Sequence, residues 1–453
     1  MPLLARAGLA TGHEDAEGAF VAGRLVGDGE ARHSRPFSDE PLQGPNGEGE
    51  PHAFTVRTRR FTTDRLASAA AKALGEALGF VPTVTGIERC RLPLPDGAHD
   101  EWSVARCTIS PGVSGFGESV IIKWLRDDPS GFRVDPAQLL TERAALEFLD
   151  SVAPGHAPCL LAADAATTLL ILEDLQPRTS LYDLLDGPPS AAATVGLRAF
   201  ARAMGRLGAA TSGLGENYYL RRRELGPVEP IRDRLGDLGI DGGFEGRWLD
   251  TIAAAEAWGL KVPDRVSTDV EAAIVELAEP GPFLAFSNGD PGENNFLVSG
   301  EDGRIIDFEA AGFRHALLDA AALYVGHPRW VIFPDPGRSG LETVYRTALA
   351  EGIPEAADDR RFGYGLSCAV LTAAIRAGSR RLIKLDRRSP GDPSRPQMIT
   401  ILEYAAATAV RLRCLTHLAG WCSALGELLR NRWPDADQLL RQLPDREAGW
   451  VRR

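Results

Sequence analysis

The chain has 453 residues, of which 44% are hydrophobic and 25% charged, as in an ordinary globular protein. No stretch approaches the about 20 continuous apolar residues that cross a bilayer, and the opening residues lack the apolar segment of a secretory signal. We therefore expect a cytoplasmic protein with no membrane partner. The net charge of −12 argues against nucleic acid as a partner. The six cysteines are scattered and lack metal-ligand spacing, which argues against structural zinc and favours reduced thiols.

The first part of the chain changes character near residue 61. Residues 1–60 mix Gly, acids, Pro, Ser and Arg with little apolar periodicity and predict a flexible leader. Helices are predicted over residues 64–74 and 136–151, where apolar residues recur at helical spacing. Short apolar runs between Gly- and Pro-bearing turns predict five strands. These runs cover residues 84–91, 102–109, 119–125, 159–163 and 168–173.

Beyond residue 175 the pattern is mostly helical. The predicted helices cover residues 190–211, 245–258, 268–278, 340–351, 361–384 and 398–431. One island with strand–loop–strand character, residues 283–308, interrupts them. A small strand-rich part before a larger helical part predicts a two-lobed α+β enzyme. We expect an N-lobe over residues 61–176 and a C-lobe over residues 177–453.

The island carries the residues that suggest chemistry. It places Asp290 five residues before Asn295, and after a hairpin with an Asp302-Gly303 turn it ends at Asp307. The hairpin should bring Asp307 back beside the loop. Asn295 and Asp307 supply the oxygen ligands that Mg²⁺ prefers, while Asp290 can orient an acceptor hydroxyl or take its proton. This set predicts phosphoryl transfer.

The same segment resembles the catalytic loop of the aminoglycoside phosphotransferase and choline kinase-like families, distant relatives of protein kinases. Their loop reads His-Gly-Asp-x-x-x-x-Asn, followed by a strand–turn–strand ending in Ile-Asp-Phe or Ile-Asp-Trp. The matching residues here are Gly289, Asp290, Asn295, Ile306, Asp307 and Phe308. The resemblance implies a bilobal protein-kinase-like fold with a small antiparallel-sheet N-lobe and a mainly helical C-lobe. It also implies ATP and Mg²⁺ as cofactors, a small-molecule hydroxyl as acceptor, and an Asp319 that braces the loop.

The family's usual His is replaced here by Asn288. That His mainly packs and hydrogen-bonds within the loop, so an amide can substitute, and we assign Asn288 to the catalytic loop of an active enzyme. A kinase-fold binding protein with weak or no turnover is the alternative. A protein kinase is less favoured, because Phe308-Glu309 stands where Phe-Gly would and no Ala-Pro-Glu follows.

The N-terminal strands supply an independent signal. Lys123 lies in the middle of an apolar strand, a costly place for a charge without a partner. In kinase-like folds such a Lys contacts the α- and β-phosphates and pairs with a Glu on the following helix. Glu142 fits that pattern better than Glu147. The alternative is a lysine on an edge strand that points to water.

Two further segments bear on nucleotide binding. The resemblance implies adenine contacts with the main chain of Glu173 and Leu175, although a purely structural strand end fits as well. The glycine-rich run from Gly112 to Ser119 ends too close to Lys123 for a phosphate loop. We expect it to be a turn between the second and third strands, and expect the nucleotide loop near residues 95–100. No Walker motif occurs, which excludes a P-loop kinase.

The charge distribution does not identify the phosphate acceptor. Residues 360–453 hold 17 Lys and Arg against 8 Asp and Glu. A solvated helix face explains this excess better than a binding patch, although it mildly disfavours a polycationic acceptor. The acidic residues Glu293 and Glu309, near the catalytic loop, instead favour a polycationic acceptor. The sequence does not indicate an oligomeric state.

Overall fold

The computed structural model describes residues 62–93, 99–125, 135–166, 168–238, 243–326 and 332–442. The leader expected over residues 1–60 and most of the nucleotide loop expected near residues 95–100 lie outside these ranges. Within them, no helix is both long enough and apolar enough to span a membrane.

In the described part of the chain, the N-terminal region forms an antiparallel sheet of five strands in the order β1-β2-β3-β5-β4. The strands are β1 (Thr83–Pro93), β2 (His99–Val113), β3 (Gly117–Trp124), β4 (Leu160–Ala163) and β5 (Leu169–Glu173). All five predicted strands are therefore confirmed. The glycine-rich run is also confirmed as the turn between β2 and β3, since Val113 pairs with Gly117.

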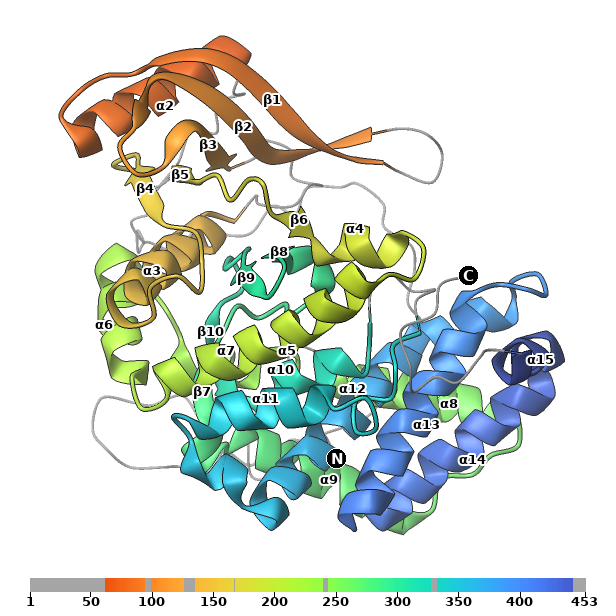
Figure 1. Ribbon diagram of the computed structural model, residues 1–453. Coiled ribbons are helices and arrows are strands. Elements are labelled where there is room, and N and C mark those ends of the chain that lie inside the picture. The colour runs from red at the N-terminus through yellow and green to blue at the C-terminus, as the bar shows by residue number, and fades with distance from the viewer. Residues whose placement is uncertain are drawn as a thin grey trace, which may run out of the picture.

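Two helices accompany this sheet (Figure 1). Helix α2 (Thr63–Leu78) begins where the Thr62 side chain accepts a hydrogen bond from the Arg65 amide, and it packs on one face of the sheet. Helix α3 (Pro136–Val152) begins at Asp135, whose side chain caps the first turn. It contacts β4 and β5 of the sheet and helix α6 of the helical region. We call the sheet with α2 and α3 the N-lobe.

The remaining chain, which we call the C-lobe, is mainly helical (Figure 1). Its α-helices are α4 (Leu181–Asp186), α5 (Ala191–Thr211), α6 (Gly215–Leu225), α7 (Pro230–Leu235), α8 (Phe244–Ala257), α9 (Asp264–Ala278), α10 (Leu317–Ala320), α11 (Leu341–Ala350), α12 (Asp359–Asp386), α13 (Ser394–Leu412), α14 (Thr416–Arg432) and α15 (Pro434–Gln442). Its 3-10 helices are η1 (Gly236–Leu238), η2 (Gly281–Phe283), η3 (Glu293–Asn295), η4 (Ala321–Leu323) and η5 (Pro354–Ala357). The expected bilobal α+β fold is confirmed.

Two small sheets of the C-lobe carry the predicted island. Strand β6 (Thr179–Ser180) pairs with β8 (Phe296–Ser299), which pairs with β9 (Asp302–Ile305). Strand β7 (Leu284–Ser287) pairs with β10 (Gly312–His315). The island is thus fixed at both ends by antiparallel pairing.

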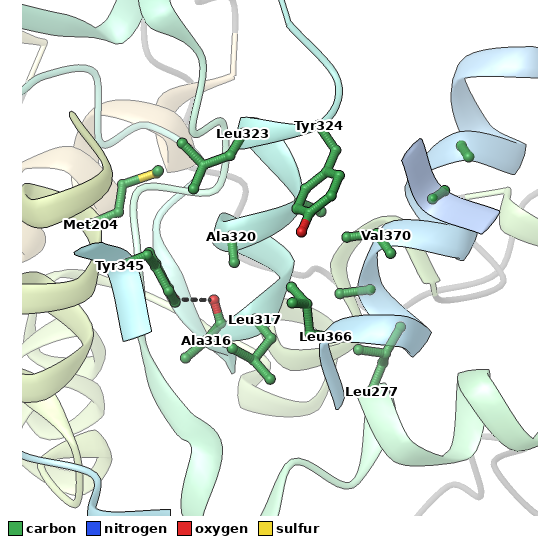
Figure 2. Packing of buried hydrophobic residues seen from close by; sticks show 14 of the residues in the cluster. Met204, Leu277, Ala316, Leu317, Ala320, Leu323, Tyr324, Tyr345, Leu366 and Val370 are labelled. Atoms are coloured by element: carbon green, nitrogen blue, oxygen red, sulfur yellow. Dashed lines mark hydrogen bonds between the residues drawn. The ribbon is translucent and has the colours of Figure 1, made fainter. Parts of the chain in front are cut away.

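The C-lobe core holds the segment that follows the island. Figure 2 shows Leu317 and Ala320 of α10 surrounded by buried apolar side chains, with Leu366 and Val370 of α12 on one side. The hydroxyl of Tyr345 donates a hydrogen bond of 2.7 Å to the carbonyl oxygen of Ala316. The start of α10 is therefore anchored in a close-packed interior.

The prediction of one continuous helix over residues 398–431 is wrong. It is two helices, α13 and α14, because Arg413 and Leu415 adopt left-handed backbone conformations with φ of 58° and 45°. The helical patterns did not predict α4, α6, α7 or α15. The long α12 also departs from regularity at Ser379, where φ is 0°.

Candidate active site

The β8–β9 hairpin brings the second half of the island back onto the first. Phe296 is the register partner of Ile305. One residue further on, the amide of Ile306 donates a 2.9 Å hydrogen bond to the carbonyl oxygen of Asn295. The expectation that the hairpin returns Asp307 to the loop is therefore confirmed. Asp307 itself has a φ of 64°, an uncommon conformation for a residue with a side chain.

Lys123 lies at the contact between the two lobes. Its Nζ donates to Glu142 Oε1 at 2.5 Å and to Asp307 Oδ1 at 2.7 Å. Strand β3 is an inner strand, between β2 and β5, and the lysine side chain is only 8% exposed, so the edge-strand alternative is wrong. Glu147, the competing partner, instead pairs with Arg143.

The Glu142 carboxylate joins this lysine to the C-lobe. Its side chain is 1% exposed, and Oε1 also accepts a 3.4 Å hydrogen bond from the amide of Phe308. One ammonium group thus lies between two carboxylates, one from each lobe. Burial strengthens such charge interactions, because little water screens them.

The loop that holds Asp290 is ordered by two asparagines. The amide nitrogen of Asn295 donates to both the carbonyl oxygen and Oδ2 of Asp290, each at 3.0 Å. The side chain of Asn295 is buried, whereas Asp290 is exposed. The amide oxygen of Asn295 accepts a 3.0 Å hydrogen bond from Asn294. The carboxylate of Asp290 is therefore oriented from one side and open to solvent.

Asn288 is buried and does not face solvent. Its amide nitrogen donates to the carbonyl oxygens of Asp290 at 3.1 Å and Ile306 at 3.2 Å. These contacts are those of a residue that holds the loop in place. The amide thus provides the hydrogen bonding within the loop that the resemblance implies for the usual histidine.

A second layer of polar contacts supports the loop from β7 and α10. Ser287 Oγ donates to Asp319 Oδ1 at 2.7 Å and accepts from the amide of Gly289 at 3.0 Å. Burial raises the pKa of Asp319 to about 6, against the opposing effects of Ser287 and Arg314. Asp319 therefore contacts the loop through Ser287, a residue that the sequence did not single out.

Arg314, on β10, is the other supporting residue that the sequence missed. Its guanidinium donates to the carbonyl oxygens of Ala310 at 2.8 Å and Gly289 at 3.4 Å. Gly289 has a φ of 85°, and a Cβ there would lie 2.1 Å from the Ala310 oxygen. This close approach of two backbone segments requires glycine.

The two residues expected at the adenine site lie where β5 leaves the sheet. The amide of Glu173 donates to the carbonyl oxygen of Cys159 at 2.9 Å, and its carboxylate accepts from the Cys159 amide at 3.1 Å. The carbonyl oxygen of Leu175 accepts a 3.0 Å hydrogen bond from the amide of Arg178. The Glu173 amide and the Leu175 carbonyl are therefore already used within the protein.

No protein-family model and no curated protein matches this sequence. The solved structures that it resembles include small-molecule kinases. A choline/ethanolamine kinase family protein from Mesorhizobium loti is 18% identical, with a TM-score of 0.39 over 75% of this chain and 93% of that one. A choline kinase from Cryptosporidium parvum is 13% identical, with a TM-score of 0.36 over 79% and 90%. The APH(2″)-IIa protein in its gentamicin complex is 12% identical, with a TM-score of 0.36 over 73% and 93%. At these identities the likeness concerns the fold alone.

The oxygen atoms of the site fit a hard divalent cation. Asp307 offers a carboxylate that is 26% exposed, and Asn295 offers an amide oxygen. The described residues contain no group of three or more His, Cys, Asp or Glu side chains that could hold a metal ion. A magnesium ion here would therefore take most of its ligands from phosphate oxygens and water, as is usual for Mg²⁺ in kinases.

Proposed function

We propose that this chain is an ATP-dependent phosphotransferase that transfers the γ-phosphate to a hydroxyl group of a small molecule. The observation that carries the proposal is the position of Lys123, whose ammonium group joins Glu142 of the N-lobe to Asp307 of the C-lobe. Lysine binds phosphate oxygens as a point charge, and its two carboxylate partners hold this ammonium group at the junction of the lobes. We place the N-lobe at residues 61–176 and the C-lobe at residues 177–453.

In this proposal the nucleotide lies between the lobes. Lys123 binds the α- and β-phosphates and Glu142 holds the lysine in place. The carbonyl oxygen of Glu173 and the amide of Leu175 bind adenine, because their other main-chain groups are engaged within the protein. Asn295 and Asp307 hold Mg²⁺, which neutralises charge on the transferred phosphoryl group when it is bound.

Asp290 is the residue that meets the acceptor. Its carboxylate is exposed and is oriented by Asn295, so it can accept a hydrogen bond from a hydroxyl group and take its proton. Asn288 and Asp319 act as positioning residues. They hold the backbone on either side of Asp290, so that the carboxylate keeps its direction during transfer.

We do not assign the basic residues of the C-terminal region to the acceptor site. Arginines of this region form ion pairs within the described chain, which favours a structural role for the charge excess. Such pairs join Arg388 to Asp392, Arg395 to Asp435, Arg411 to Glu342 and Arg432 to Asp386.

The test is consumption of ATP in the presence of a library of hydroxyl-bearing metabolites and antibiotics, with Asp290→Asn as the matched blank. We expect transfer of labelled γ-phosphate to one acceptor class. Asp290→Asn should lower turnover by about 10²-fold or more and leave ATP affinity nearly unchanged. Wild-type rates in Asp290→Asn would contradict the role of Asp290. Binding of Mg-ATP without transfer to any acceptor would favour the alternative of a binding protein.

A further inference from the structure

Arg106 projects from the same face of the N-lobe sheet as Lys123. The register pairs Val104 with Lys123 and Arg106 with Ile121, and directly paired residues point to the same face. The opposite face is filled by the residues in between, which pack against α2. They include Ala105, Cys107, Val120 and Ile122. Arg106 is thus a diagonal neighbour of Lys123 on the face that turns toward the C-lobe.

The edges of the Arg106 guanidinium are held by the segment that follows β5. Nε donates to Asp174 Oδ2 at 2.7 Å, and Nη2 donates to Oδ1 at 3.4 Å. With its amide oxygen turned toward the arginine, Gln176 accepts from Nη1 and Nη2 at 3.1 Å. Ser119 Oγ donates to Asp174 at 2.6 Å and fixes that carboxylate. These contacts use most of the N–H groups of Arg106.

On this face Arg106 lies toward the end of β5, where it contacts Asp174, whereas Lys123 pairs with Leu170, further back along that strand. Asp174 lies between Glu173 and Leu175, the two residues whose main chain is the proposed adenine site. Lys123 instead contacts Asp307, at the proposed phosphate end. The guanidinium is therefore on the nucleobase side of the site.

We propose that Arg106 stacks the flat face of its guanidinium on the purine base of the bound nucleotide, a role that rests on the proposed function. A phosphate is recognised through the N–H edges of an arginine, and these edges are taken by Asp174 and Gln176. The side chain is nevertheless 35% exposed. A guanidinium whose plane is fixed and whose edges are occupied binds an aromatic ring through its face.

Stacking has a signature that separates it from edge recognition. Every purine presents a π-face, so stacking does not distinguish adenine from guanine. The contact should therefore contribute equally to ATP and GTP binding, and should contribute nothing to binding of tripolyphosphate, which has no base. An arginine that contacted phosphate would contribute to the binding of all three ligands, tripolyphosphate included.

The experiment is calorimetric titration of Mg-ATP, Mg-GTP and Mg-tripolyphosphate into the full chain. The variants are Arg106→Gln and Arg106→Lys. The second is chosen because a lysine at this position can still pair with Asp174, which should preserve the local structure. Arg202→Ala is the matched control, because Arg202 forms an ion pair with Glu301 on the C-lobe. We expect both Arg106 variants to weaken ATP and GTP by about 2-fold to 30-fold. Tripolyphosphate affinity, and all affinities of Arg202→Ala, should match wild type.

Three outcomes would overturn the assignment. Wild-type ATP affinity in Arg106→Lys would show that a point charge suffices. An equal loss of tripolyphosphate binding would show a phosphate contact or a general distortion. A loss confined to one of the two nucleotides would show edge recognition. Failure of the wild-type chain to bind any nucleotide would instead contradict the proposed function, which keeps the two failures distinct.

Discussion

The buried amide of Asn288 donates a 3.2 Å hydrogen bond to the carbonyl oxygen of Ile306, the residue that precedes Asp307. The same nitrogen donates to the carbonyl oxygen of Asp290. A single side chain therefore fixes the spacing between the proposed acceptor-binding carboxylate and the proposed metal-binding one.

Replacing Asn288 should disturb turnover more than nucleotide binding. Asn288→Ala removes a donor from the Ile306 carbonyl and one of the donors to the Asp290 carbonyl, which also accepts from Asn295, and should lower the free energy of unfolding by about 1–3 kcal/mol. We expect kcat to fall and ATP affinity to change little, because the side-chain hydrogen bonds of Asn288 go to Asp290 and Ile306 and lie outside the proposed contacts with adenine and with the α- and β-phosphates. Asn288→His should keep more activity than Asn288→Ala, since the ring can also donate. Equal activity of the Asn288→Ala variant and the wild-type protein in a steady-state assay would contradict this role.

Gly289→Ala should destabilise the fold through a backbone clash. The new Cβ would meet the Ala310 oxygen at 2.1 Å, in addition to the strain of a φ of 85°. Gly300→Ala is the matched control, because Gly300 also has a positive φ, 59°, but has nothing within 4 Å of the added atom. We expect Gly300→Ala to cost about 1 kcal/mol in chemical denaturation, and Gly289→Ala to cost clearly more.

Asp319 should make stability depend on pH. Its pKa is raised to about 6 by burial, whereas an unfolded Asp titrates near 3.9. Between about pH 4 and 6 the folded state keeps a proton that the unfolded state has released, so stability falls as pH rises through this window. Asp319→Asn removes the titration and retains an oxygen for the Ser287 hydroxyl.

The measurement is the free energy of unfolding of both proteins from pH 4 to 7. As pH rises through this window, the wild-type protein should lose about 3 kcal/mol of unfolding free energy relative to Asp319→Asn. A pH-independent difference would show that the Asp319 pKa is not raised.

The contacts of Lys123 should appear in a double-mutant cycle. Lys123→Met leaves the Glu142 carboxylate, 1% exposed, without its cation, and should cost about 3–5 kcal/mol in stability. Adding Glu142→Gln removes the buried charge and should restore most of that loss, although activity stays low. Lys72→Met is the control, because Lys72 and Glu76 form an exposed pair that should contribute less than about 1 kcal/mol. Additive losses in thermal unfolding would contradict the coupling.

The sequence predicted the strands and the island because local signals define them. Apolar runs such as residues 119–125 end at glycine or polar turns, and the Asp302-Gly303 pair marks a hairpin. The break between α13 and α14 has no such signal. It depends on left-handed Arg413 and Leu415, residue types that rarely adopt this conformation, so the helical pattern continued through it.

Helix α6 escaped prediction because its charged sequence has no clear apolar stripe. Its position comes from Tyr218 and Tyr219, whose rings pack against aromatic side chains from other elements. Motif spacing likewise identified Asp290, but not the residues that hold the loop. Ser287 and Arg314 act through contacts with residues distant in sequence or with backbone atoms, and neither kind of contact leaves a pattern in the chain.

The two contacts of the Glu142 Oε1 atom have a consequence for movement between the lobes. Because Oε1 accepts from both the Lys123 ammonium and the Phe308 amide, rotation of α3 about its axis would break both contacts together. Separation of the two lobes instead breaks the bond from the Phe308 amide, while the Lys123–Glu142 pair, which lies within the N-lobe, can persist. The rate at which the Phe308 amide proton exchanges with deuterium would report how often that event occurs.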